Sequence, residues 1–414
     1  MTFFLARQRV LLFFLLAGMV VPAFSQPKNI ITSIRVNGLK LTKPRTAEEP
    51  LRRFLGQEAD LIDRDNVKAA VIDQGILDPL SVTIEEDTEM QGKTLVVEVK
   101  EKWPVFFGPF LFTGSGGLTA GLFFYHANAF GLNDQMVLGG MYKNGGWLAM
   151  ALYGARPGSA GYFGWFAKSS FSEWEHRNAN ANDETLRRFN TRSIEAGASL
   201  QYKINNIADT AFNISYTNTE LLDTESPVNM PDSGMRFFEF GPEISLRKTD
   251  WDGYFLLEQT ASLKYNIIVD LTADVWHSIS FKCVYEKPVL PGFRVNIRCG
   301  GIFRPDAPEL LETGPDEAGV NILPVSFSAR YYTGLSLGLE KYLYRFSFGT
   351  ISLFGAWQMA YSGGAILGNR FDYGVISSLR FYMSRLAIPA MGAGLAYNIM
   401  ADYFQFFFSI GMTL

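Results

Sequence analysis

The chain has little charge, few histidines and almost no cysteine. Only 19% of its 414 residues are charged, and the formal net charge is −4. Because a chain without a basic surplus is a poor partner for nucleic acid, we expect no such partner. The two cysteines, Cys283 and Cys299, are too few for a disulfide framework or a cysteine-rich zinc site. The histidines His126, His176 and His277 show no metal-ligand spacing, so we expect no metal and no cofactor.

The chain also lacks long apolar runs beyond its first residues. No later stretch of about 18 residues is free of charge or turn signals, so we do not expect helices to anchor the mature chain. The start is typical of an export signal, with an apolar run over 10–24 after two arginines. Small residues, Ala23 and Ser25, precede a plausible cut before Gln26. We therefore predict a signal peptide over 1–25, without a lipoprotein anchor.

Aromatic side chains and glycine, in contrast, are abundant. Aromatic residues make up 14% of the chain, which holds 35 Phe and 39 Gly. This mixture suits strands that have one face in lipid and rings at the membrane borders, and it argues against an ordinary soluble enzyme. We expect a soluble domain over 26–103 and a membrane domain over 104–414.

Residues 26–103 carry the pattern of a small α+β domain. Asp63 is expected to cap its second helix and Pro79 to end it. The predicted order is strand, helix, helix, strand, strand. The elements fall at 31–41, 46–55, 63–79, 81–84 and 95–99.

From residue 104 onward, runs of about ten residues alternate between apolar and polar side chains. In the last run, Phe404 and Phe406 lie on one face and Tyr403 and Gln405 on the other, while Phe407 breaks the pattern. A strand between lipid and a polar lumen requires this alternation. About sixteen such runs predict a transmembrane antiparallel β-barrel.

The connections between these runs alternate in length. Long loops at one end and tight turns at the other are typical of bacterial outer-membrane barrels whose first strand rises from the periplasm. We therefore predict an outer-membrane location, with residues 26–103 in the periplasm. The long connections all follow odd-numbered runs, at 175–186, 222–233, 305–328 and 362–370.

A hairpin that turns at Pro291 would place Cys283 opposite Cys299 on the lipid face. Arg294 and Arg298 would then point into the barrel. Two facing thiols can form a disulfide where the cross-strand geometry is suitable. The alternative, which we favour, is a pair of small apolar side chains in contact with lipid.

The soluble segment resembles the POTRA module. It has a strand that ends in Val36-Asn37-Gly38, two helices, and the closing run Val97-Glu98-Val99-Lys100-Glu101, while Asp73-Gln74-Gly75-Ile76-Leu77 stands where the family has Gly-Tyr/Phe-Phe. Such a module followed by a sixteen-stranded barrel is similar to the BamA/TamA-like superfamily of outer-membrane assembly and translocation proteins, which includes bacterial surface antigens. The resemblance implies that an exposed sheet edge adds a strand from an unfolded client. The alternative is an inert spacer domain.

Two features of the barrel segment support the same resemblance. Asn128-Ala129-Phe130-Gly131 is similar to the family's Asn-Leu-Phe-Gly turn, although any glycine-containing turn could carry these residues. The final run resembles the family's closing strand, with a glycine kink at Gly411. It ends in Leu414, where the family usually has an aromatic residue.

A third, weaker match concerns the family's long sixth loop, whose Arg-Gly-Phe/Tyr motif brings an Arg to a Glu on strand twelve and an Asp on strand thirteen. Here Arg330-Tyr331-Tyr332 follows the sixth loop, and Glu340 lies on the next strand. The resemblance implies that Arg330, Tyr332 and Glu340 form the motif, with Glu340 as the single counterion because 353–357 contains no Asp. The alternative is an ordinary lumen arginine on strand twelve.

The first and last runs, 105–113 and 403–414, are expected to meet at the seam that closes the barrel. Pro109 cannot donate a ladder hydrogen bond, and Gly108 and Gly411 weaken the two sides. We predict that this seam opens laterally and passes a client strand into the membrane. An edge proline tolerated near the barrel rim is about as good an explanation of Pro109.

The function expected from these features is outer-membrane protein insertion without enzymatic activity, since no nucleophile or paired carboxylates can be assembled from the inward positions. The expected partners are unfolded outer-membrane protein clients, outer-membrane lipid and accessory lipoproteins. A polypeptide secretion pore and a passive porin or surface antigen remain as alternatives.

Overall fold

The computed structural model describes two compact units, Met1–Lys102 and Trp103–Leu414, which are treated separately below. The predicted signal peptide over 1–25 and Gly411 lie outside the described residues. The described residues are 29–410 apart from 73, 88–91, 115–116, 144–145, 156, 158–161, 206, 226, 253–254, 273, 313, 315–318, 325, 348, 365–367 and 384–388.

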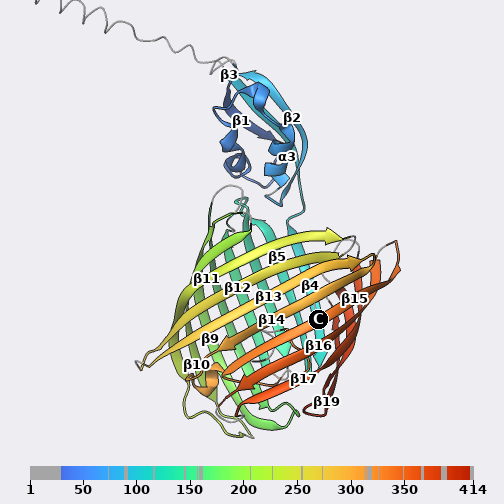
Figure 1. The fold of residues 1–414 in the computed structure, drawn as a ribbon. Helices are drawn as coiled ribbons and strands as arrows, with labels where there is room; N and C mark the ends of the chain where they lie inside the picture. Colours follow the sequence, from blue (N-terminus) through green and yellow to red (C-terminus); the bar gives the residue numbers. More distant parts are fainter. Residues whose placement is uncertain are drawn as a thin grey trace, which may run out of the picture. The chain divides into compact units, whose positions relative to one another are not determined.

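The first unit is a three-stranded sheet packed against short helices (Figure 1). The strand order is β1-β3-β2, with β1 parallel and β2 antiparallel to β3. The predicted order of elements is thus confirmed. The elements are β1 (Ile31–Asn37), α2 (Pro44–Glu48), η1 (Glu49–Phe54), η2 (Ala59–Leu61), α3 (Arg64–Ile72), β2 (Leu77–Asp87) and β3 (Gly92–Glu101).

Apolar side chains from the helices and the sheet form the core of this unit. Leu51, Val67, Leu95 and Val97 are fully buried, and burial of each side chain contributes about 1.5–3 kcal/mol. The turn after β1 requires glycine, because Gly38 has φ +92° and a Cβ there would lie 2.1 Å from the Val99 carbonyl oxygen.

Two details of the module differ from the sequence prediction. The helix predicted over 46–55 is divided into α2 and η1, because Pro50 has no N–H to continue the α-helical ladder. Pro79 does not end a helix. It lies inside β2, next to a register shift between Pro79 and Ser81, and an edge strand tolerates proline there.

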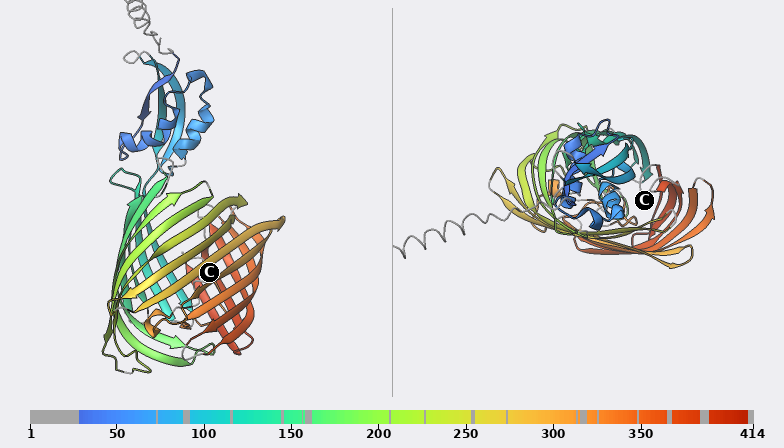
Figure 2. Two further views of the ribbon diagram at one scale, coloured as in Figure 1. Left: turned by 60° about the vertical axis from the view of Figure 1, so that its left-hand side comes forward. Right: turned by 90° about the horizontal axis from the view of Figure 1, so that it is seen from above.

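The second unit is a closed antiparallel barrel of sixteen strands, β4 to β19, which confirms the predicted fold class and strand count (Figures 1 and 2). The strands are β4 (Val105–Gly114), β5 (Gly117–Ala129), β6 (Asp134–Lys143), β7 (Gly146–Ala155), β8 (Phe163–Ala179), β9 (Thr185–Lys203), β10 (Ala208–Leu222), β11 (Met235–Asp252), β12 (Phe255–Asp270), β13 (Val275–Leu290), β14 (Phe293–Phe303), β15 (Tyr331–Arg345), β16 (Gly349–Gly363), β17 (Arg370–Met383), β18 (Pro389–Asn398) and β19 (Tyr403–Ile410).

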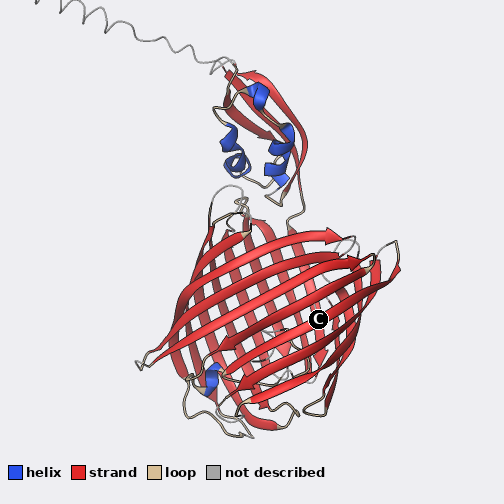
Figure 3. Ribbon diagram, in the orientation of Figure 1, coloured by secondary structure: helices blue, strands red, loops and turns tan. Residues whose placement is uncertain are grey.

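Side chains alternate between the two faces of the barrel wall. On β16, Trp357 points outward and is 43% exposed, whereas its neighbour Gln358 points inward and is 2% exposed. Among the described residues of the barrel, helix is limited to η3 (Glu309–Leu311), the small helical turn drawn within the barrel in Figure 3. No described helix is long and apolar enough to cross a membrane.

We call the end of the barrel where β4 begins the turn end, and the opposite end the loop end. One connection at the loop end is shorter than predicted. Residues 175–186 are mostly strand, because β8 continues to Ala179 and β9 starts at Thr185. Polar pairs such as Arg177 and Thr185 line this extension, which therefore lacks the alternation that marks a lipid-facing strand.

Candidate functional site: the seam, the lumen loop and the buried charges

The seam between β4 and β19 closes the barrel, and part of it lies in the described residues. Among the described residues, three pairs join these strands: Leu111 with Ile410, Phe112 with Ser409, and Thr113 with Phe408. Every other pair of neighbouring strands has at least eight described pairs. The described part of β19 ends at Ile410, so these three pairs are the described part of the seam.

The predicted seam residues Gly108 and Pro109 lie on β4, in the part of the strand for which no partner on β19 is described. Pro109 is exposed and lies opposite Leu122 on β5. Gly108 lies under an aromatic ring, since a Cβ there would be 2.2 Å from Phe123. Glycine at this position therefore makes room for a phenylalanine of β5.

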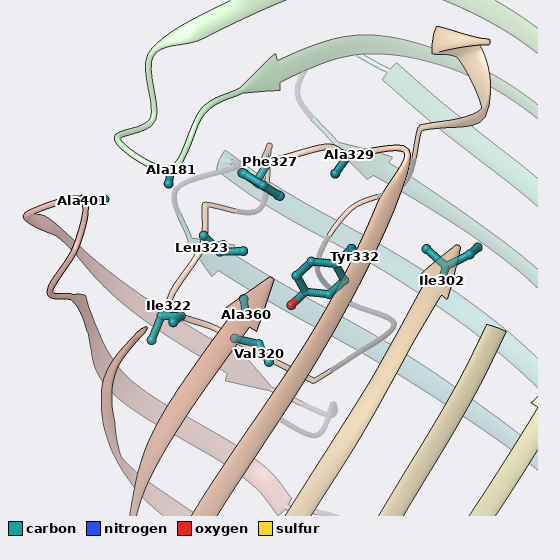
Figure 4. Packing of buried hydrophobic residues seen from close by; sticks show 10 residues of the cluster. All are labelled: Ala181, Ile302, Val320, Ile322, Leu323, Phe327, Ala329, Tyr332, Ala360 and Ala401. Carbon is teal, nitrogen blue, oxygen red and sulfur yellow. The ribbon is translucent and has the colours of Figure 1, made fainter. Parts of the chain in front are cut away.

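The connection between β14 and β15 comprises residues 304–330, and its described residues, which leave out 313, 315–318 and 325, fold into the barrel at its loop end. We call it the lumen loop. Ile322, Leu323 and Phe327 of this loop pack against inward side chains of the wall and against two turns, as Figure 4 shows. Its cluster comprises Ala181, Ile302, Val320, Ile322, Leu323, Phe327, Ala329, Tyr332, Ala360 and Ala401.

The lumen loop also makes polar contacts with β8 and β9. The backbone N–H of Ala179 donates to the Ser326 carbonyl oxygen at 2.8 Å. The Arg187 side chain, which is 4% exposed, lies 3.9 Å from carboxylate oxygens of both Glu309 and Glu312. The loop therefore bridges opposite parts of the wall.

The predicted pairing of Arg330 with Glu340 is wrong. Arg330 precedes β15 and its guanidinium lies 3.4 Å from Glu309 in the lumen loop. Tyr332, the third predicted motif residue, points inward and packs in the cluster of Figure 4. Arg330 and Tyr332 thus contact the lumen loop, whereas Glu340 lies in a separate cluster with Arg294.

Glu340 is the centre of a buried polar cluster on the inner wall, and its side chain is fully buried. Arg294 on β14 donates to Glu340 Oε2 from Nε at 3.0 Å and from Nη2 at 2.6 Å, and Arg380 on β17 donates to the same oxygen at 3.2 Å. The Tyr382 hydroxyl donates to Oε1 at 2.9 Å, and the Ser352 hydroxyl also donates to Oε1. The two oxygens of this carboxylate thus accept at least five hydrogen bonds, which saturates their acceptor capacity.

The cluster extends to β13 through a second carboxylate. Arg294 Nη1 donates to Glu286 at 3.1 Å, and Arg298 lies 3.6 Å from the other Glu286 oxygen. Asn296 also donates to Glu286. Ion pairs and hydrogen bonds near the turn end thereby connect five consecutive strands, β13 to β17.

Sequence reasoning placed Arg294 inside the barrel but did not identify its partner. The signal was present in the register, because a hairpin between β14 and β15 pairs Arg294 directly with Glu340. Ser352 on β16 supplies a hydroxyl to Glu340. Arg380 on β17 carried no sequence signal.

The predicted family turn joins β5 to β6. Asn128 is 3% exposed, and its side-chain oxygen accepts the Asn133 N–H at 2.7 Å. Phe130 and Gly131 have φ values of 57° and 74°. The buried asparagine and the left-handed conformation of both residues explain this local sequence without a functional role.

Cys283 and Cys299 face each other across β13 and β14, as the hairpin predicts, and both are free thiols. Among the described residues, no group of three or more His, Cys, Asp or Glu side chains could hold a metal ion.

A cavity of about 700 Å³ lies inside the barrel along β5 to β12, on the other side from the buried charges. Its charged lining consists of Lys168, Asp209, Glu239, Glu243, Arg247 and Lys264, three acids and three bases.

The sequence matches no protein-family model and no curated protein. Three solved structures are similar in fold. BamA from Haemophilus ducreyi lacking POTRA domains 1–3 has 13% identity and a TM-score of 0.64, covering 93% of this chain and 85% of that one. CdiB from Acinetobacter baumannii has 12% identity and a TM-score of 0.64, covering 92% and 74%. CdiB from Escherichia coli has 13% identity and a TM-score of 0.62, covering 92% and 76%. The chain therefore has the fold of the BamA and CdiB barrels, as the resemblance of its sequence implied.

Proposed function

We propose that this chain inserts unfolded outer-membrane proteins into the membrane through the seam between β4 and β19, without enzymatic chemistry. The observation that carries the proposal is the β4 side of the seam, where Pro109 has no N–H to donate to a ladder and Gly108 lies next to it. A client strand that pairs with the edge of β4 would satisfy its backbone hydrogen bonds before it meets lipid. The similarity in fold to BamA agrees with this role.

The soluble module has an edge suited to receive a client in the periplasm. In the order β1-β3-β2, the outer edge of β1 is paired at its first residue, since Ile31 N–H donates to the Gln57 carbonyl oxygen at 2.9 Å and Gly56 N–H donates back to the Ile31 carbonyl oxygen. The other edge is β2, where Leu80 is 66% exposed. We propose that β2 adds the client strand, independently of much of the client's sequence.

The lumen loop argues against a passive porin, because a porin requires an open lumen.

Polypeptide secretion is the second candidate. The cavity of about 700 Å³, whose charged lining sums to zero, and the similarity in fold to CdiB favour it.

Cross-linking of the seam tests the proposal. Thr113→Cys with Phe408→Cys joins β4 to β19 at a directly paired position, in a chain that also carries Cys283→Ala and Cys299→Ala. The matched control, Tyr397→Cys with Phe404→Cys, joins β18 to β19. In liposomes, we expect the seam cross-link to abolish insertion of a urea-unfolded eight-stranded barrel and the control to preserve it. Undiminished insertion by the cross-linked seam would reject the proposal.

A further inference from the structure

Two glutamine side chains bind the main chain of the lumen loop, and one of them belongs to the seam strand. Gln405 lies on β19 and Gln358 on β16. They are 7% and 2% exposed, and both point into the barrel. Neither has a role in the proposed insertion step itself.

The peptide groups of Asn321 are held from two sides. Its N–H donates to Gln358 Oε1 at 2.8 Å, and its carbonyl oxygen accepts from Gln405 Nε2. Gln405 Nε2 also donates to the Leu323 carbonyl oxygen at 3.3 Å. Gln358 Nε2 is anchored in turn by the Ser336 hydroxyl at 3.2 Å. The loop therefore links β19 to β15 and β16, which are not its neighbours in the barrel.

Apolar contacts strengthen the same link. Ala401, in the turn before β19, belongs to the cluster that contains Ile322 and Leu323 of the loop, and Tyr403, at the start of β19, packs against that cluster. Figure 4 shows Ala401, Ile322 and Leu323 as members of this cluster. Further along β19, Phe407 is 3% exposed and packs in a cluster with Phe354 and Ile376. Tyr403, Gln405 and Phe407 thus anchor β19 from the lumen.

β4 has a different set of contacts. Its described pairs with β19 run from Leu111 to Thr113, and its ten pairs with β5 run from Val105 to Gly114. When the seam separates, β19 keeps its eight described pairs with β18. It also keeps its lumen contacts through Gln405 and Phe407.

We propose that Gln405 and Gln358 are positioning residues through which the lumen loop fixes β19, one of the two strands of the seam. This inference deepens the proposed insertion function and rests on it for its biological meaning. The fixed position of β19 is itself a physical property that can be measured without any client.

The test uses Gln405→Glu in the full-length protein in nanodiscs. The variant replaces the donating amide with a carboxylate facing two carbonyl oxygens, which is unfavourable in a buried site. Gln201→Glu is the matched control, since Gln201 lines the cavity and has no described hydrogen bond to the loop. Gel mobility with and without heating establishes that each variant folds as a barrel.

Hydrogen–deuterium exchange of peptides covering 319–324 and 403–408 is the primary readout. We expect Gln405→Glu to speed exchange in both peptides about tenfold, which corresponds to about 1.4 kcal/mol, and Gln201→Glu to change neither. Gln358→Leu, which removes the acceptor of the Asn321 N–H and the amide that donates to Ser336, is expected to affect the same two peptides. Faster exchange in the loop alone, with 403–408 unchanged, would overturn the inference, as would no change in either peptide.

Client insertion is measured on the same samples. Faster exchange together with reduced insertion supports both proposals. Faster exchange with normal insertion supports the fixed β19 and counts against its role in insertion. Failure of the seam cross-link to block insertion, in contrast, rejects the proposed function and leaves the exchange result intact.

Discussion

Arg294 and Glu340 lie directly opposite each other on β14 and β15, and two nitrogens of the guanidinium donate to one carboxylate oxygen at 3.0 and 2.6 Å. Arg380 donates to the same oxygen from β17, two strands further along the wall. The pair is therefore the centre of a network that joins strands well beyond its own hairpin. Such a network needs all of its members, because a buried charge without a partner is strongly destabilising.

Glu340→Gln is expected to destabilise the barrel. The change leaves two buried guanidinium groups, Arg294 and Arg380, without their shared carboxylate, so the free energy of unfolding should fall by about 3 kcal/mol. Urea titration followed by gel mobility measures it. Glu195→Gln, which breaks the half-exposed pair with Lys168, should cost less than about 1 kcal/mol. Equal effects of the two variants would contradict the network.

Gly394→Val is expected to disturb the packing of β19. A Cβ at Gly394 would lie 2.4 Å from the Phe407 ring, so the ring must leave its site in the lumen. We expect a loss of about 1–3 kcal/mol in unfolding free energy, with faster hydrogen exchange in 403–408. The control is Gly139→Ala, where a Cβ meets Met150 at an ordinary 3.4 Å. A neutral Gly394→Val would show that Phe407 does not hold β19.

The soluble module should show a pH-dependent opening at the segment after β1. Burial raises the pKa of Glu101, but hydrogen bonds from the backbone N–H groups of Leu41, Lys40 and Thr42 outweigh it and lower the pKa below its usual 4.5. A lowered pKa stabilises the fold above about pH 4.5, and this contribution is lost as the pH falls through the folded-state pKa.

We therefore expect hydrogen-exchange protection of the Leu41 and Thr42 amides, corrected for intrinsic rates, to fall in acid. Glu101→Gln should lower that protection at neutral pH and remove most of its pH dependence. Glu98→Gln is the control, because Glu98 binds the Asn37 side chain instead. A pH dependence that persists in Glu101→Gln would assign the effect to another group.

Cys283 and Cys299 should remain reduced and dispensable. Both are free thiols on neighbouring strands, where small apolar side chains suffice. Mass spectrometry after denaturation in N-ethylmaleimide should find two modified thiols, and Cys283→Ala with Cys299→Ala should change unfolding free energy by less than about 1 kcal/mol. Recovery of an unlabelled, disulfide-linked chain would contradict this.

The sequence was sufficient to predict the parts of this protein that depend on local pattern. Alternation with a period of two is repeated along every membrane strand, so sixteen strands and the direction of Arg294 followed from it. The tight turn at Gly292 also set the register that places Cys283 opposite Cys299. The same local reasoning predicted the order of elements in the module, although Pro79 was assigned to the end of a helix.

The pairing of strands decided what local pattern could not. Several inward arginines are available to Glu340, and the register of β15, β16 and β17 brings Arg380, 40 residues away, to the same oxygen as Arg294. Likewise, Phe407 breaks the alternation because Gly394 on β18 leaves room for its ring in the lumen. The path of the lumen loop, and with it the contact between Asn321 and Gln405, depends on packing between segments 84 residues apart. The periodicity of a strand specifies which face a side chain occupies. The residues that the side chain contacts on that face are specified only by the tertiary structure.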